Sequence, residues 1–125
     1  MENKLVLSSL GHTWILDLDG TILKHNGYKD IGEDVLLPGA SQFINGLPES
    51  DFVIFITSRN VIYKEETEEF LRTNGIRFDT IIYNAPYGER ILINDNKPSG
   101  LKMAYAINKK RDTSEFCEYK IDKEV

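Results

Sequence analysis

The chain reads TWILDLDGT from Thr13 to Thr21. Apolar and β-favouring residues lead into two carboxylates two positions apart, and Gly-Thr follows at once. Because side chains alternate along an extended strand, Asp17 and Asp19 are predicted to point to the same side of the chain. Open parallel sheets bind their ligands beyond the carboxyl ends of the strands. The stretch therefore predicts a buried strand that delivers two acids to a binding edge.

The acid pair favours a metal ion. Two close carboxylates repel each other unless a cation or a shared proton offsets their charge. Hard cations prefer oxygen ligands, and Mg²⁺ is the usual ion where phosphate is also bound. The alternative interpretation is an Asp-rich turn after a strand, because Asp and Gly are frequent turn residues.

Bulk properties limit the possible functions. With 125 residues the chain is predicted to be one domain, 1–125, with a single core. The net charge of −5 and the lack of a long basic run disfavour nucleic acid as a partner. Cys117 is the only cysteine, which excludes an intramolecular disulfide and a multi-cysteine metal site. The chain has no signal-like or membrane-length apolar run, so we expect a cytoplasmic protein with no membrane partner.

Strand and helix patterns alternate along the chain, which predicts βαβ units and a mostly parallel sheet. The expected class is α/β, a three-layer sandwich with a Rossmann-like core. The sequence predicts strands at 13–18, 52–56, 79–83 and 90–93, and helices at 38–45, from 57 to about 73 and from 99 to about 110. It also predicts a short lead-in strand or irregular segment at 4–9, a loop or small hairpin at 20–36, and an edge strand or irregular tail at 115–121. In the second helix the charged residues, Glu68 among them, are expected to face water, and Phe70 and Leu71 to face the core.

Three predicted strand ends carry polar side chains, namely Asp17 with Asp19, Thr57 with Ser58, and Asp95. Right-handed crossovers place these ends at one edge of the sheet. A junction from strand to helix at Thr57 offers free N–H groups and the positive end of a helix dipole to a phosphate. The alternatives remain open: Thr57 and Ser58 can simply cap a helix, and Asp95 can belong to an Asn-Asp-Asn turn.

The residues DLDGT, from Asp17 to Thr21, resemble the first motif of the haloacid dehalogenase-like (HAD) phosphatase superfamily, Asp-x-Asp-Gly-Thr. The resemblance implies that Asp17 is the nucleophile that forms an aspartyl-phosphate and that Asp19 is the general acid and base. It also implies a Mg²⁺ held by the side chains of Asp17 and Asp95 and by the backbone carbonyl of Asp19. Thr57 matches the second motif, in which a hydroxyl and neighbouring amides hold the phosphate.

The chain departs from the family at the third motif, where a Lys is usual. The corresponding loop reads Asn-Ala-Pro at 84–86 and carries no cation. Lys97 follows Asp95 and is the best substitute for phosphate binding, although a solvent-facing Lys97 remains an alternative. Lys64 is a weaker candidate. Arg59 can reach the site, but a solvated first-turn position is the favoured interpretation.

No interval between the motifs is long enough for a cap domain, so the resemblance implies a capless phosphatase. In the family a hairpin flap follows the first motif, and here it corresponds to residues 20–36, called the flap below. His25 and Tyr28 lie on it, and solvent exposure is the favoured interpretation for both over substrate contact. An open site can accept a macromolecular substrate, or a second copy of the chain can supply a lid.

The favoured function is hydrolysis of a small phosphorylated metabolite, such as a sugar phosphate. The alternatives are a phosphatase for a phosphoprotein or a nucleic-acid end, and a non-catalytic phosphate-binding regulatory module. The missing third-motif Lys favours the regulatory module. Retention of both acids, which binding alone does not need, opposes it.

Overall fold

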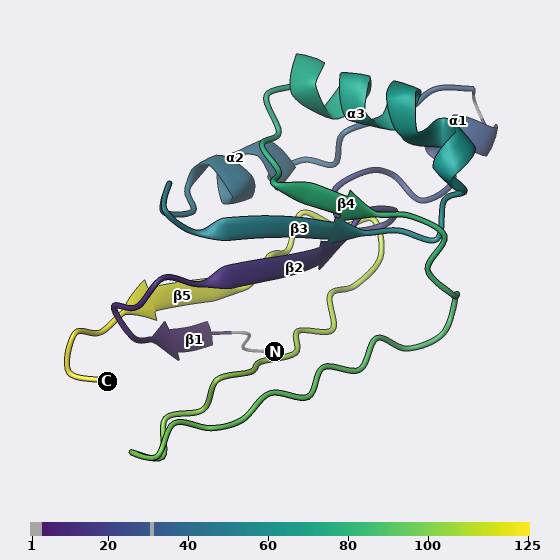
Figure 1. Cartoon of the computed structure of the whole chain (residues 1–125). Coiled ribbons are helices and arrows are strands. Elements are labelled where there is room, and N and C mark those ends of the chain that lie inside the picture. Colours follow the sequence, from purple (N-terminus) through teal and green to yellow (C-terminus); the bar gives the residue numbers. More distant parts are fainter. Residues whose placement is uncertain (1–3, 31) are drawn as a thin grey trace. The chain divides into compact units, whose positions relative to one another are not determined.

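The computed structural model describes residues 4–30 and 32–125 (Figure 1). The chain divides into two compact units. Unit 1 gathers Tyr87–Asn108, Cys117–Val125 and the described part of Met1–Leu10, and unit 2 consists of Gly11–Pro86 and Lys109–Phe116. The single domain expected from chain length stays a prediction.

Unit 2 is built on a parallel sheet. Its strands are β2 (Thr13–Asp17), β3 (Phe52–Ile56) and β4 (Thr80–Ile82), in the order β2-β3-β4. The register pairs Asp17 with Ile56 and Ile56 with Ile82, so the three strands end together. The α/β class with a parallel sheet is therefore confirmed, as are the three strands predicted for this part of the chain.

Helices cover one face of this sheet (Figure 1). They are α1 (Gly27–Asp30), α2 (Ala40–Asn45) and α3 (Lys64–Thr73), the last preceded by a 3₁₀ turn, η1 (Val61–Tyr63). Alternation along β3 turns Val53 and Phe55 into the core, where both are fully buried, while Phe52 is 46% exposed. Leu71 of α3 is also fully buried, as predicted. No helix in the described part of the chain is long and apolar enough to cross a bilayer.

The second predicted helix begins later than expected. Thr57 does not cap it: the hydroxyl of Thr57 accepts a hydrogen bond from the backbone N–H of Arg59, which folds residues 57–60 into a loop. Asn60 is the actual cap, because its backbone is extended and its side chain accepts from the N–H of Ile62. The helix then ends at Asn74, as the sequence predicts. The short helix predicted at 38–45 begins at Ala40 because Gly39 has a φ of 86°.

The flap matches its prediction as a loop or small hairpin, apart from the single turn α1 and residue 31, which lies outside the described residues. Leu23 bridges to Leu36 in the antiparallel sense, which closes the hairpin. Ile22 and Leu23 are fully buried and fix the flap to the core of unit 2.

Unit 1 contains a parallel pair, β1 (Lys4–Leu7) with β5 (Glu118–Ile121), which confirms the lead-in strand and the predicted edge strand near the C-terminus. The strand predicted at 90–93 is wrong, because within the described part of the chain this run pairs with no strand and Ile93 is 91% exposed. Apolar residues favour a strand, but only ladder hydrogen bonds create one.

The helix predicted from 99 to about 110 is also wrong. A turn takes its place, since Gly100 has a φ of 97° and its N–H donates to the carbonyl of Lys97. The N–H of Lys97 donates in turn to the carbonyl of Leu101, which closes the turn on itself. This left-handed backbone at Gly100 directs the chain away from helical geometry in what would have been the first turn.

A buried carboxylate joins the starts of β2 and β3. Asp51 accepts hydrogen bonds from the indole N–H of Trp14 at 2.9 Å and from the backbone N–H of His12 at 3.1 Å. Burial alone would raise the pKa of Asp51, but these hydrogen bonds outweigh it and lower the pKa. Asp51 is therefore ionised in the folded protein and holds the two strands in register.

We expect Asp51→Asn to destabilise the protein by about 1–3 kcal/mol at neutral pH, since it weakens hydrogen bonds to a buried charged acceptor. The folded-state pKa is depressed, so this stabilisation is complete above the unfolded-state value of about 3.9 and is lost as the pH falls through the folded-state pKa. Urea unfolding at a series of pH values tests this. The difference from wild type should shrink in acid, and the exposed neighbour variant Glu49→Gln should show little difference at any pH.

Candidate functional site

The carboxyl ends of the three strands of unit 2 meet. Asp19 lies two residues beyond β2, and Thr57 lies directly after β3. The Thr57 hydroxyl donates to Oδ2 of Asp19 at 3.2 Å, and the Thr57 N–H donates to the carbonyl of Ile82 at 2.9 Å. Two of the three predicted strand ends, those after β2 and β3, are thus joined by a direct hydrogen bond.

A buried arginine occupies the space next to Asp19. The Arg59 side chain is 2% exposed, although the sequence interpretation expected it to be solvated, and that expectation is wrong. Its Nη2 donates to Oδ1 of Asp19 at 2.8 Å and to Oδ1 of Asp34 at 2.6 Å. Burial alone would lower the pKa of Arg59, but the two carboxylates outweigh it and raise the pKa well above the usual range. Arg59 is therefore a permanent cation shared between two acids.

Tyr28 covers the face of this cation. The guanidinium carbon of Arg59 lies 4.0 Å from the centre of the Tyr28 ring, a cation–π distance. The Tyr63 ring packs edge-on against Tyr28, with 5.2 Å between the ring centres. Burial raises the pKa of Tyr28, and the expectation of a solvent-exposed loop tyrosine is wrong, since Tyr28 is half-buried on α1. His25, also on the flap, is half-buried as well, so its expected solvent exposure is equally wrong, and its backbone N–H donates to Asp112 at 2.8 Å.

The other predicted site residues of unit 2 take these positions. Asp17 is the last residue of β2 and is half-buried. The Ser58 hydroxyl donates to the carbonyl of Pro86 at 3.3 Å. Gly20, directly after the acid pair, has a φ of 89°, and a Cβ built on it would lie 3.2 Å from Cγ of Arg111. Glycine at this position therefore serves both the backbone turn and the close approach of Arg111.

Asp95 and Lys97 belong to unit 1 and are exposed. The N–H of Asp95 donates to the side-chain oxygen of Asn94 at 3.1 Å, within the Asn-Asp-Asn sequence. Their roles as metal ligand and phosphate-binding cation stay predictions. Lys64, the weaker candidate, forms an ion pair with Glu68 at 2.7 Å.

The ligands predicted for Mg²⁺ in unit 2 are oxygen donors, the type that this ion prefers. Among the described residues no group of three His, Cys, Asp or Glu side chains is gathered as a metal cluster. Mg²⁺ keeps several waters and needs only one or two carboxylates, so the Asp17 side chain and the Asp19 backbone carbonyl are a sufficient start for a site. The Asp19 side chain is committed to Arg59 and Thr57, which leaves its backbone oxygen as the donor that the resemblance assigns.

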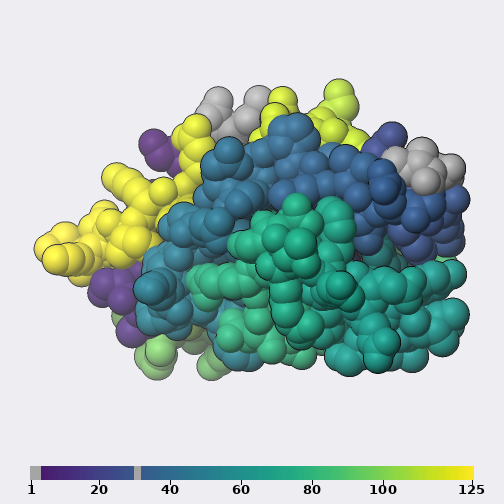
Figure 2. All heavy atoms as spheres, turned by 90° about the horizontal axis from the view of Figure 1, so that it is seen from above, coloured from purple at the N-terminus to yellow at the C-terminus, as the bar shows by residue number. Residues whose placement is uncertain are grey.

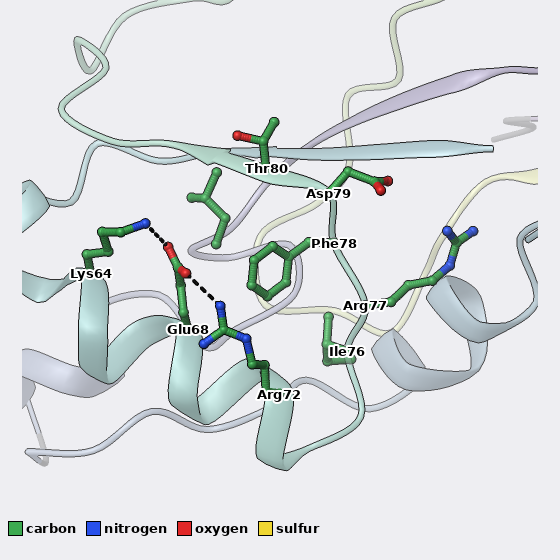
Figure 3. Close-up of a pocket in the computed structure, with 9 residues that line it drawn as sticks. Lys64, Glu68, Arg72, Ile76, Arg77, Phe78, Asp79 and Thr80 are labelled. Atoms are coloured by element: carbon green, nitrogen blue, oxygen red, sulfur yellow. Dashed lines mark hydrogen bonds and ion pairs between the residues drawn. The ribbon is translucent and has the colours of Figure 1, made fainter. Parts of the chain in front are cut away.

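A pocket of about 380 Å³ lies between α3 and the chain leading into β4 (Figure 3). Glu68 lines it and accepts hydrogen bonds from Lys64 at 2.7 Å, Arg72 at 3.0 Å and the Tyr83 hydroxyl at 3.1 Å. Burial alone would raise the pKa of Glu68, but these donors outweigh it and lower the pKa. The expectation that Glu68 faces water is wrong, because its carboxylate finds three donors around a buried position.

The cations of this pocket are already engaged. Lys64 and Arg72 bind Glu68, and Arg77 donates to the backbone carbonyls of Asp51 and Pro48. In the space-filling view the α3 segment, in teal, lies beside the blue segment of α2 and the flap (Figure 2). The polar side chains of the pocket therefore hold α3 in place and are not available to a ligand. None of the residues that line it is Asp19, Asp34 or Arg59.

Comparison with known proteins gives one informative similarity. No family model and no curated protein matches the chain. A solved structure, "Structure of the Pnkp1/Rnl/Hen1 RNA repair complex", contains a chain that is 27% identical with a TM-score of 0.53. The match covers 66% of this chain and 28% of that chain, so the present chain spans little more than a quarter of its neighbour's length. The chain thus shares its fold with part of a component of an RNA repair complex.

We expect Arg59→Met to destabilise the protein by about 3–5 kcal/mol, because it leaves two buried carboxylates facing each other without their cation. Urea unfolding measures the loss. Lys24→Met is the matched control, since it removes an exposed cation from the same flap and should change stability by no more than about 0.5 kcal/mol. Equal effects of the two substitutions would mean that Arg59 does not hold the acids in solution.

Proposed function

We propose that the chain is a Mg²⁺-dependent phosphomonoester hydrolase of the HAD type. The observation that carries the proposal is the hydrogen bond of 3.2 Å between Thr57 and Asp19, which joins the first-motif strand end to the second. Asp17 and Asp19 lie at the carboxyl end of β2, where an open parallel sheet presents its ligands. A binding module needs neither a nucleophile nor an acid, so the pair favours catalysis.

In this proposal Asp17 attacks the phosphorus atom, the leaving oxygen departs, and an aspartyl-phosphate forms. Asp19 donates the proton to the leaving oxygen and afterwards takes one from the water that hydrolyses the aspartyl-phosphate. The phosphoryl oxygens bind at the Thr57–Ser58 segment, where the Thr57 hydroxyl exchanges its hydrogen bond to Asp19, and the Ser58 hydroxyl its bond to Pro86, for one to the substrate. Bound Mg²⁺ supplies positive charge against the phosphoryl oxygens. Asp95 is the proposed further ligand and Lys97 the proposed cation in place of the third-motif Lys.

The substrate class has two candidates. A sugar phosphate or related metabolite is the one that the sequence favours. The similarity to a chain of an RNA repair complex supports the other, a phosphate at a nucleic-acid end. The net charge of −5 opposes extended contact with a nucleic-acid backbone, but an enzyme that acts on an end needs only a few phosphate contacts. A second copy of the chain acting as a lid remains part of the small-metabolite proposal.

We expect the wild-type chain to hydrolyse p-nitrophenyl phosphate with Mg²⁺ and to lose that activity when the ion is chelated. Asp17→Asn should reduce turnover to background, because the amide is too weak a nucleophile to form the phosphoenzyme. Release of p-nitrophenol measures the rate. Glu33→Gln, a charge change on an exposed flap residue, should keep the wild-type rate. Turnover by Asp17→Asn at the wild-type rate would refute the role of Asp17.

A substrate panel separates the two classes. It compares RNA and DNA oligonucleotides phosphorylated at the 3′ or the 5′ end with hexose phosphates, and kcat/KM is measured through released phosphate. If the nucleic-acid candidate is right, one of the oligonucleotides should exceed every hexose phosphate by at least about 100-fold, which corresponds to about 2.7 kcal/mol of transition-state binding. The opposite order would support the metabolite.

A further inference from the structure

Every N–H group of the Arg59 guanidinium already has a protein acceptor. Arginine carries five such donors. The Nε–H is shared between the two carboxylate oxygens of Asp19, at 3.2 Å each. The two N–H groups of Nη2 reach Asp19 and Asp34, and those of Nη1 reach Asp34 at 3.1 Å and the Thr67 hydroxyl at 2.9 Å. The ring of Tyr28 covers one face of the guanidinium.

A phosphoryl oxygen can therefore receive an N–H from Arg59 only if a protein oxygen gives one up. Such an exchange would leave a carboxylate underbonded at a site where Asp34 is 8% and Asp19 16% exposed, which is costly. Arg59 is in consequence poorly suited to bind the substrate, although it is the cation next to Asp19. Its bonds instead fix both carboxylate oxygens of Asp19.

We propose that Arg59 is a positioning residue for Asp19 and not a phosphate ligand, and that Asp34 of the flap sets its orientation. This inference rests on the proposed phosphatase function. Asp34 accepts from both terminal nitrogens of Arg59, a two-point contact that fixes the plane of the guanidinium. Tyr28 holds the same plane from its face. The two contacts from the flap thus determine where the Nε–H and Nη2–H groups meet Asp19.

The orientation of Asp19 matters for the proton-transfer step alone. A carboxyl group that donates a proton must lie within hydrogen-bond reach of the leaving oxygen, and a small misplacement can cost about 100-fold in rate. In the proposed site substrate and inorganic phosphate bind at the Thr57–Ser58 segment and the metal, where binding exchanges single hydroxyl hydrogen bonds, to Asp19 and Pro86, and breaks no charge pair. Loss of Asp34 should therefore lower kcat and leave phosphate binding unchanged.

The experiment compares Asp34→Asn with wild type in the full chain, with Mg²⁺ present and with phenyl phosphate as substrate, because the leaving oxygen of phenol needs a proton. We expect kcat to fall about 10- to 100-fold, while KM and the inhibition constant of inorganic phosphate stay within about 2-fold. Glu33→Gln makes the same change from acid to amide one residue earlier, on an exposed side chain, and should match wild type. Thermal melting establishes that each variant is folded at the assay temperature.

A second set of variants tests the route through Arg59. If Asp34 acts only through Arg59, adding Asp34→Asn to Arg59→Lys should cause no further loss of kcat, whereas independent effects would multiply. Tyr28→Phe keeps the ring over the guanidinium and should retain kcat, while Tyr28→Leu should lower it with KM unchanged. The two Tyr28 variants leave the buried charges intact, so they test the proposal even if Asp34→Asn does not fold.

Three results would overturn the inference, and the third is distinguishable from the first two. If the wild type is active and kcat is unchanged in Asp34→Asn or Tyr28→Leu, the positioning role alone is refuted. It is also refuted if these variants raise KM and the phosphate inhibition constant at constant kcat, because Arg59 would then be a phosphate ligand. A wild-type chain with no Mg²⁺-dependent turnover of any phosphomonoester refutes the proposed function, and the inference with it.

Discussion

A single buried cation organises the carboxyl-terminal edge of the sheet in unit 2. Arg59 comes from the loop after β3, and its partners come from three other places: Asp19 after β2, Asp34 on the flap and Thr67 on α3. Each of the two carboxylates would be costly to bury without a cation. The elements therefore have one mutually compatible arrangement, the one in which all of them meet at the guanidinium.

The amino-terminal edge of the same sheet has the opposite charge pattern. There a buried carboxylate, Asp51, is the shared group, and the N–H groups of His12 and Trp14 are its donors. Between the two edges lies an apolar core that includes Val53 and Phe55. Hydrophobic burial, which has no preferred direction, holds the sheet against its helices, whereas the hydrogen bonds of the two polar clusters form only at particular distances and angles.

The strands of unit 2 could be predicted because β-rich apolar runs and local turn residues determine them. Arg59 could not, because a position three residues after a strand is usually solvated, and the acids that bury it lie 40 and 25 residues away in sequence. Asp34 carried no local signal at all. The wrong helix at 99–110 has a different origin: its composition favours a helix, but the left-handed backbone of Gly100 replaces the first turn. Long-range charge pairing and single-residue backbone geometry are the two effects that local patterns miss.

Neighbouring positions of the Asp17–Thr21 motif restrict substitution for different reasons, and Gly20 is the example. Its φ of 89° strains any residue with a side chain, and a Cβ at 3.2 Å from Cγ of Arg111 would in addition require the Arg111 side chain to shift. The requirement is steric, whereas that on the acids beside it is chemical. Substitutions of Gly20 are therefore selected against because of backbone geometry. In a variant library of the chain, substitutions at position 20 should be depleted even under selection for folding alone.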